Sequence, residues 1–511
     1  MSQSQESKRK RRLPPLSIEH LWALTVLVGI FVFVNTHPIR PHDFWWHMAV
    51  GREILATGRI PLVDTFSYTA AGTPYPSYQM FWLIETALYL LYRTGGAALV
   101  IFVHSLVITT AYGLLLWLGQ RLSGSWRAGA FATLFAAALG LNDWNVRPQA
   151  VTFAIAALFL LAIHEYRQTA RREWLLVFPL GMALWVNSHG TFPFGLLLLG
   201  LWLAEESWML LTSQGERAWG RLRPPALTLG ASLLACLINP RGWGIVNYVT
   251  GMSAHPIIQN LVPEWAPSTL DTLNGQLFIG GLLLSAALLA LSPRRPTLTE
   301  LCTFLVFGGL GLKTSRGIIW FGIMMAPVLA NHLPGLAREA RALLPRSEPP
   351  FRPATPPKRE VILNGALAGL LLLGAALSLP WFKEALPLPP AKAGLISAET
   401  PVAATAYLLE AQPPGPLFHA MSFGSYLIWA APEYPTFVDG RIELFPVEVW
   451  RDYLTIAAGA SGWERRLEQY GIQTLLLAPQ ETPGLIHAAR NAPAWRQVYL
   501  DDSAVIFTRA Q

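Results

Sequence analysis

The sequence predicts an α-helical polytopic membrane protein, with about eleven transmembrane helices and a small α/β extracytoplasmic domain at its C-terminus. Of its 511 residues, 52% are hydrophobic and 14% are charged, whereas charged residues make up about 25% of an ordinary soluble domain. Apolar runs long enough to cross a bilayer, which takes about 20 residues, recur along the first three quarters of the chain. Both observations indicate a membrane protein.

The apolar runs place the expected helices. We expect transmembrane helices near residues 18–36, 97–119, 128–142, 149–165, 174–188, 191–211, 225–239, 275–292, 298–313, 316–333 and 361–380. The run at 79–92 is shorter and contains Glu85, and we expect it to lie at the outer surface instead of spanning. The Pro- and Arg-rich stretch 334–360 is stiff and polar, so we expect a cytoplasmic linker there.

The chain changes character after the last run, and residues 381–511 are expected to form the extracytoplasmic α/β domain. Short β-like runs at 417–421, 436–438, 474–478 and 498–508 alternate with helix-like runs at 400–409, 462–470 and 482–491. Ser461 is suited to cap the helix that follows it, and Gly471 is suited to end that helix.

The distribution of basic residues predicts the topology. With 79–92 outside, 21 of the 38 Lys and Arg residues fall in loops on one side, which the positive-inside rule makes cytoplasmic. The basic tail 1–17 is then cytoplasmic, and the long loop 37–96 of the membrane module 18–333 faces outward, as does the C-terminal domain. The expected location is the cytoplasmic membrane. The net charge of +7 reflects this topology and not a nucleic-acid-binding face.

The outer loop after the first helix holds a group that could do acid–base chemistry. Asp43 could act as a general base towards a hydroxyl or an amine, or it could cap a helix that begins at Phe44. His47, one helical turn further on, could pair with a phosphate or with Asp43. Glu85 lies in a semi-buried apolar run, which is costly without a partner.

Other polar residues gather in loops on the same side. Asp143 and Arg147 are candidates for a functional site, or they form an internal ion pair that fixes their loop. His189, in Asn-Ser-His-Gly, could bind a phosphate or a sugar hydroxyl, or it could be a turn residue. Glu264 could be a second catalytic carboxylate, a metal ligand or a solvated loop residue.

Two arginines at the outer ends of apolar runs could bind an anion. Arg316 is placed to hold a lipid phosphate by bidentate hydrogen bonds, or it is an interfacial anchor whose side chain reaches towards water. Arg241 is a second candidate for the phosphate. The sequence has no Walker motif, no GxGxxG in a strand–helix context, no HExxH, no CxxC and no GxSxG. Nucleotide-driven pumps, zinc proteases and serine hydrolases are therefore disfavoured.

Several strings together resemble the C-type glycosyltransferase superfold, which includes protein O-mannosyltransferases, lipid A aminoarabinose transferases and oligosaccharyltransferases. The strings are Asp43-Phe-Trp-Trp-His47 with its downstream Gly51-Arg-Glu-Ile-Leu, Gly58-Arg-Ile-Pro61 and Asp64-Thr-Phe-Ser67, then Trp185-Val-Asn-Ser-His189-Gly190, Gly424-Ser-Tyr-Leu-Ile-Trp429 and Phe437-Val-Asp439-Gly-Arg441. The C-terminal domain lacks the WWD string of oligosaccharyltransferases, which argues against recognition of a peptide sequon.

The resemblance implies transfer of a sugar from a polyprenyl-phosphate-linked donor to a lipid, glycan or protein acceptor on the outer side, in contact with membrane lipids. Asp43 would be the base, Asp143 a carboxylate that positions the acceptor or acts behind the base, and Arg147 or Arg316 would hold the phosphate. No cofactor is assured, although a divalent cation, Mg or Mn, remains open. The alternatives are a non-catalytic relative that binds lipid-linked glycan or scaffolds an envelope assembly, and a transporter.

Overall fold

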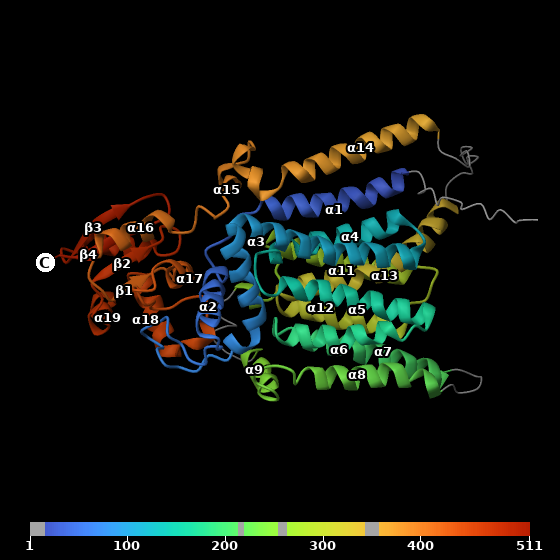
Figure 1. Cartoon of the computed structure of the whole chain (residues 1–511), viewed down its shortest axis with the longest axis horizontal. Helices are drawn as coiled ribbons and strands as arrows, with labels where there is room; N and C mark the ends of the chain where they lie inside the picture. Colours follow the sequence, from blue (N-terminus) through green and yellow to red (C-terminus); the bar gives the residue numbers. More distant parts are fainter. Residues whose placement is uncertain (1–15, 213–218, 254–262, 343–356, 511) are drawn as a thin grey trace, which may run out of the picture.

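The computed structural model describes residues 16–212, 219–253, 263–342 and 357–510. A bundle of helices occupies one end of the molecule, the C-terminal domain occupies the other, and the loop that carries α2 (Phe44–Thr57) lies between them (Figure 1). The basic cluster Lys8 to Arg12 and the central part of the expected linker lie outside the described residues. Their expected location on the cytoplasmic side of the membrane stays a prediction.

Each of the eleven apolar runs coincides with a helix. The bundle helices are α1 (Ile18–Thr36), α3 (Tyr78–Ser123), α4 (Trp126–Gly140), α5 (Ala150–Thr169), α6 (Glu173–Val186), α7 (Pro193–Thr212), α8 (Arg223–Ala235), α11 (Leu273–Leu291), α12 (Leu298–Lys313), α13 (Gly317–Ala342) and α14 (Lys358–Leu377). Within the described ranges, seven helices are long and apolar enough to cross a membrane: α1, α3, α5, α7, α11, α13 and α14. The other four have 13 to 16 residues. The protein is thus a multi-pass membrane protein, and the count of eleven spans stays a prediction.

The run at 79–92 is the first arm of α3. This helix has 46 residues, but its backbone leaves the helical region at Gly95 and Gly96, where Gly96 has a φ of 63° that favours glycine. The first arm packs against α2, where a Cβ on Gly51 would lie 2.2 Å from the backbone oxygen of Glu85. Glycine at position 51 therefore allows the two helices to touch.

The C-terminal domain has the expected α/β character. Its sheet contains β1 (Leu417–His419), β2 (Thr474–Leu477), β3 (Trp495–Leu500) and β4 (Val505–Arg509) in the order β1-β2-β4-β3. The β1/β2 pair is parallel, and the other two pairs are antiparallel. The helices around the sheet are α16 (Val402–Ala411), α17 (Met421–Ala430), α18 (Val447–Ala457), α19 (Trp463–Gln469) and α20 (Pro483–Asn491).

Three local expectations for this domain differ from the structure. The run 498–508 contains parts of two strands, because a turn at 501–504 reverses the chain. The expected strand 436–438 makes only a single bridge, between Thr436 and Ser67 of the outer loop. Gly462, with a φ of 85°, occupies the N-cap position of α19 instead of Ser461. Gly471 follows this helix with a φ of 65°, as expected.

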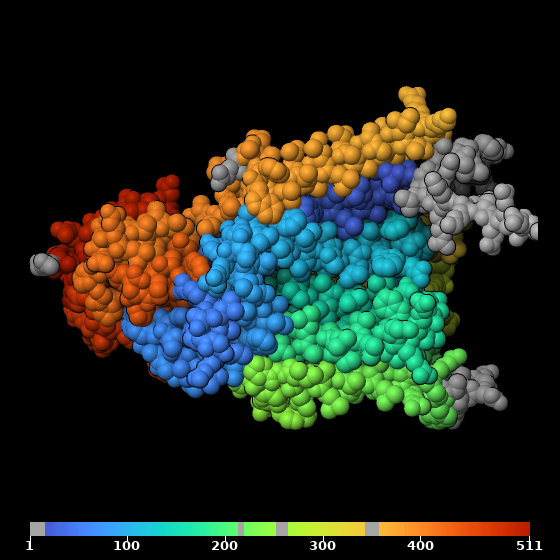
Figure 2. All heavy atoms as spheres, viewed as in Figure 1, coloured from blue at the N-terminus to red at the C-terminus, as the bar shows by residue number. Residues whose placement is uncertain are grey.

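A buried ion cluster joins the C-terminal domain to the outer loop. Arg441 pairs with Asp439 of its own domain at 2.6 Å and with Asp64 of the loop, and all three side chains are fully buried. It also donates a hydrogen bond to the hydroxyl of Tyr78 at the start of α3. The domain and the loop form one continuous packed surface in the space-filling view (Figure 2). Asp439 and Arg441 thus pair within their own domain, and Asp64 extends this pairing to the outer loop of the membrane module.

Candidate functional site

A cavity of about 980 Å³ lies where the bundle, the outer loop and the C-terminal domain meet. The bundle supplies the end of α1, residues of α3 and the loop between α4 and α5, and the C-terminal domain supplies α17 and the short helix η5 (Ile442–Leu444). The predicted site residues that line it are Asp43, His47, Arg147, His189, Glu264 and Arg316. Three chain segments that are distant in sequence thus form one site.

Asp43 stands at the N-cap position of α2 but does not cap it. Its backbone is in the right-handed helical region, and its side chain accepts no hydrogen bond from the first turn of the helix. The capping interpretation is therefore wrong for the side chain. The carboxylate instead pairs with Arg147, with 3.1 Å between Oδ2 and Nε. This leaves Asp43 at the cavity wall, where it can meet a ligand.

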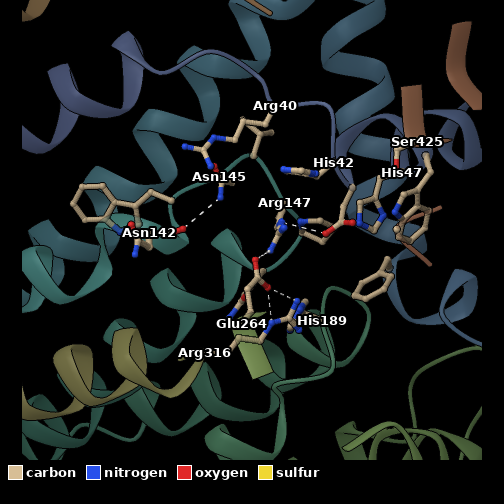
Figure 3. Close-up of a pocket in the computed structure, with 18 of the residues that line it drawn as sticks. Arg40, His42, His47, Asn142, Asn145, Arg147, His189, Glu264, Arg316 and Ser425 are labelled. Atoms are coloured by element: carbon tan, nitrogen blue, oxygen red, sulfur yellow. Dashed lines mark hydrogen bonds and ion pairs between the residues drawn. The ribbon is translucent and has the colours of Figure 1, made fainter. Parts of the chain in front are cut away.

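Four charged residues, Asp43, Arg147, Glu264 and Arg316, form a continuous chain of ion pairs along the cavity. Arg147 also contacts Glu264, with 2.7 Å between Nη1 and Oε1, and the other oxygen of Glu264 lies 2.7 Å from Nη2 of Arg316. Figure 3 shows Arg147, Glu264 and Arg316 converging within the cavity. Their side chains are 19 to 33% exposed. The chain is thus ordered by direct contacts and remains reachable from the cavity.

Backbone hydrogen bonds hold together Glu264 and Arg316, two residues of this chain of ion pairs. Glu264 lies in the short helix η3 (Pro263–Trp265), and Arg316 immediately precedes α13. The Arg316 amide donates to the backbone oxygen of Glu264 at 3.0 Å, and the Ser315 amide donates to Ala266. The guanidinium of Arg316 also lies over the ring of Trp265 at 5.3 Å, a cation–π contact. The interpretation of Glu264 as a solvated loop residue is therefore wrong.

The two arginines dominate the electrostatics of the cavity. Burial alone would raise the pKa of Glu264, but Arg147 and Arg316 outweigh it and lower this pKa to about 2. Burial lowers the pKa of His189 to about 3, and the same two arginines contribute. Glu264 is therefore ionised and His189 neutral at physiological pH, and the negative charge of Glu264 offsets part of the charge of the two arginines.

Asp143 does not pair with Arg147, so the expected internal Asp–Arg pair is wrong. It lines a smaller cavity of about 320 Å³ that shares Glu264 and Arg316 with the main one. Burial and the negative charge of Glu264 raise the pKa of Asp143 to about 7, although Arg316 and Arg147 oppose the shift. Asp143 thus lies behind the chain of ion pairs and outside the lining of the main cavity.

His47 and Glu85 form a pair. The Nδ1 atom of His47 lies 2.9 Å from Oε1 of Glu85, and both side chains are almost completely buried. Glu85 has the partner that its apolar surroundings require, although its Oε2 atom is buried without one within the described residues. Burial lowers the pKa of His47, with Arg147 and His189 adding to the effect. Of the two partners considered for His47, Asp43 is therefore wrong, and a phosphate stays a prediction.

His189 is a turn residue that also lines the cavity, and its expected binding of a phosphate or sugar hydroxyl stays a prediction. The amide of Thr191 donates to its Nδ1 atom at 3.2 Å, which closes the turn after α6 and leaves a proton on Nε2. The ring also lines the cavity beside Arg316 (Figure 3). Arg241 lies outside this cavity and donates to Gln79 at 2.9 Å. Arg241 is therefore separate from the arginines that could hold a phosphate here.

Sequence reasoning missed the contribution of the C-terminal domain to this cavity. A Cβ on Gly440 would lie 2.7 Å from Oδ1 of Asp43, so the backbone of this domain touches the candidate base. Ser425 and Glu443 line the same cavity. Both lie in or near the quoted strings 424–429 and 437–441, so the only signal was that resemblance. Arg40 and His42, which precede Asp43 in the sequence, are further lining residues.

The donor set offers little for a metal ion. Within the described residues, no group of three or more His, Cys, Asp or Glu side chains is arranged to hold one. Asp43 and Glu264 are the two carboxylates of the chain of ion pairs, and each already pairs with at least one arginine. The expectation of Mg or Mn stays a prediction.

Comparison with known proteins reveals similarity only at the level of structure. No family model matches the sequence, and no curated protein matches it. The archaeal oligosaccharyltransferase AglB of Archaeoglobus fulgidus, solved with an inhibitory peptide and a dolichol-phosphate, is 12% identical with a TM-score of 0.55. The alignment covers 96% of this chain and 75% of AglB.

Two further solved structures have the same architecture. The aminoarabinose transferase ArnT of Cupriavidus metallidurans, in the apo state, is 16% identical with a TM-score of 0.52, over 96% of this chain and 97% of ArnT. The mycobacterial arabinofuranosyltransferase AftD is 14% identical with a TM-score of 0.54, and this chain spans 40% of its length. The chain therefore has the C-type glycosyltransferase fold that its sequence resembles.

Proposed function

We propose that this protein is an integral-membrane glycosyltransferase that moves a sugar from a polyprenyl-phosphate donor to an acceptor on the outer side of the membrane. The observation that carries the proposal is the chain Asp43–Arg147–Glu264–Arg316 in a large cavity of this fold. It combines a carboxylate suited to accept a proton with two guanidinium groups suited to bind a phosphate.

The two arginines are the proposed phosphate site. The two guanidinium groups share the carboxylate of Glu264, and a phosphate oxygen presents a similar anionic acceptor. A donor phosphate would join or displace this carboxylate, and the arginines would stabilise the charge that builds on the phosphate as it leaves. Asp143, behind Glu264 and Arg316, would act as a positioning residue.

Asp43 is the proposed general base. The acceptor hydroxyl or amine attacks the anomeric carbon of the donor sugar and transfers its proton to the Asp43 carboxylate. The bond between the anomeric carbon and the phosphate oxygen breaks, and its electron pair leaves with the phosphate. Attack from the side opposite the phosphate inverts the configuration at this carbon. Asp43, next to Arg147 yet able to face the C-terminal domain, suits this arrangement.

The location of the cavity favours a transferase over a transporter. Its polar lining lies at the end of the bundle where the C-terminal domain sits, whereas transporter sites are expected near the middle of the membrane. A long polyprenyl chain could remain in the bilayer while its phosphate enters the cavity. The proposed topology has the N-terminus in the cytoplasm and the C-terminal domain outside, in the cytoplasmic membrane.

The test uses the full chain in lipid nanodiscs with a panel of radiolabelled undecaprenyl-phosphate hexoses and pentoses. We expect release of undecaprenyl phosphate and transfer of label by the wild type. Asp43→Asn should reduce transfer by at least about 100-fold, a loss typical of a missing general base. Glu448→Gln, an exposed substitution in α18, is the control and should leave transfer unchanged. Unchanged transfer by Asp43→Asn would remove this residue from the mechanism.

A further inference from the structure

The wall of the cavity formed by the C-terminal domain has polar groups that the proposed donor chemistry does not use. Glu443 lies in η5 between Ile442 and Leu444, which are buried in the hydrophobic core shared by this domain and the outer loop. The Trp450 indole donates to the Ile442 backbone oxygen at 3.0 Å. These contacts fix η5, so the position of the Glu443 carboxylate is set before any ligand arrives.

One oxygen of Glu443 is fully engaged and the other is not. Its Oε1 atom accepts hydrogen bonds from Tyr75 at 2.8 Å, Tyr248 at 3.0 Å and Ser77 at 3.1 Å. Burial raises the pKa of Tyr75 and of Tyr248, and the charge of Glu443 adds to this, so both phenols stay protonated and donate. Its Oε2 atom receives no hydrogen bond from the described residues, while the side chain lines the cavity.

Ser425 supplies a second group that lacks a partner. Its residue is only 1% exposed, yet its hydroxyl makes no hydrogen bond with the part of the chain that the structure describes. It lines the same cavity, and a Cβ on Gly440 would lie 3.5 Å from its Oγ. Buried hydroxyls almost always have a hydrogen-bond partner. Its Oγ is not among the fully buried atoms without a partner, so this hydroxyl opens to the cavity and is free to bind a ligand there.

The two groups lie on the same side of the site as the candidate base. The Gly440 backbone approaches Asp43 and Ser425 together, and Glu443 follows it by three residues. Ser425 and Glu443 both line the cavity from the C-terminal domain, whereas Arg147 and Arg316 line it from the bundle loops. The cavity is thus divided: guanidinium groups gather on the bundle side, and hydrogen-bonding groups without positive charge gather on the wall of the C-terminal domain.

We propose that Glu443 and Ser425 form an acceptor subsite for a neutral, polyhydroxylated ligand such as a glycan or another polyol. The free carboxylate oxygen accepts hydrogen bonds from hydroxyl groups, and the serine hydroxyl both donates and accepts. Glu443 and Asp43 repel an anionic acceptor, whereas Arg147 and Arg316 disfavour a cationic one. The subsite holds an acceptor hydroxyl beside Asp43, so the inference rests on the proposed function.

The test measures binding of a panel of short-chain alkyl glucosides, galactosides and mannosides to the full chain in nanodiscs, by tryptophan fluorescence. We expect at least one neutral glycoside to bind, and Glu443→Gln and Ser425→Ala to weaken it by about 10-fold and about 3-fold, the loss of one hydrogen bond to a charged and to a neutral group. Alkyl glycosides carrying a phosphate or an amine should bind more weakly.

The controls separate the acceptor subsite from the donor site and from folding. Glu448→Gln removes an exposed carboxylate of the same domain, and Tyr248→Phe removes one of the three hydrogen bonds to Glu443 but keeps its charge. Both should bind the glycosides as tightly as the wild type does. If Glu443→Gln does not fold, Glu443→Asp keeps the charge and withdraws it from the ligand.

Three results would overturn the inference. The first is a loss of affinity for undecaprenyl phosphate in Glu443→Gln or Ser425→Ala, which would place these residues at the donor site. Binding of every glycoside with equal affinity to the wild type and Glu443→Gln, or no binding to the wild type, would likewise refute the subsite. Binding of undecaprenyl phosphate to the wild type but not to Arg316→Gln would still support the donor site. The two proposals can therefore fail separately.

Discussion

Two arginines, Arg147 and Arg441, each bind two carboxylates, but their surroundings give them different roles. Arg441 and both of its partners are fully buried, and they join the outer loop to the C-terminal domain. Arg147 and its partners are partly exposed, and they line the large cavity. Burial thus separates a contact that holds domains together from one that a ligand can enter.

Replacing Arg441 should have the largest effect on stability. Arg441→Met leaves the carboxylates of Asp64 and Asp439 buried and unpaired, which costs about 3–5 kcal/mol. We expect a marked drop in apparent Tm in detergent and rapid proteolysis between the bundle and the C-terminal domain. Arg466→Met, which breaks the part-exposed pair with Asp452, should cost less than about 1 kcal/mol. Equal effects of the two substitutions would mean that Arg441 does not hold the domains together.

Adding one methyl group at Gly440 should disturb the other network with little loss of stability. In Gly440→Ala the new Cβ meets the end of the Asp43 side chain, which can move aside. A displaced base should lower transfer by about 10- to 100-fold, since small misplacements of reacting groups are costly. Transfer and apparent Tm are measured together. Full activity in a folded Gly440→Ala protein would show that the position of Asp43 is not critical.

The pH dependence of stability should reveal Asp143. Its pKa is raised to about 7 in the folded protein, against about 3.9 in the unfolded chain. The folded state therefore binds this proton more tightly, and the stability that it contributes is lost as pH rises from about 4 to above 7. Asp143→Asn cannot ionise, so its apparent Tm should exceed that of the wild type at pH 8 and match it near pH 4. A difference that does not vary with pH would contradict this.

The membrane class and the α/β nature of the C-terminal domain could be predicted because each depends on local pattern. Apolar runs of sufficient length must form helices in a bilayer, and all eleven runs do coincide with helices. Most pairings in the site could not be predicted in this way. Glu264 meets Arg147 across 117 positions of sequence, and Arg441 meets Asp64 across 377. Such contacts depend on how helices and loops pack, and no local pattern records that.

The sequence predicted which residues belong to the candidate site better than it predicted which of them pair. Asp43, Arg147, His189, Glu264 and Arg316 all reach one cavity, because each follows or precedes an apolar run on the same side. Of the two partners considered for His47, Asp43 was wrong, since the observed partner Glu85 belongs to an arm of α3 that packs against α2. Ser425 and Glu443 were missed because nothing in their own sequence places the C-terminal domain against Asp43.

The most direct test of the cavity network is the binding of undecaprenyl phosphate to the full chain in nanodiscs, measured for the wild type, Arg316→Gln and, as a control outside both arginine networks, Arg466→Gln. If the cavity network holds the donor phosphate, Arg316→Gln should weaken binding by at least about 10-fold, as expected for loss of a charge-assisted hydrogen bond, with little change in apparent Tm. Arg466→Gln should bind like the wild type. Equal affinity of all three proteins would contradict the proposed donor site.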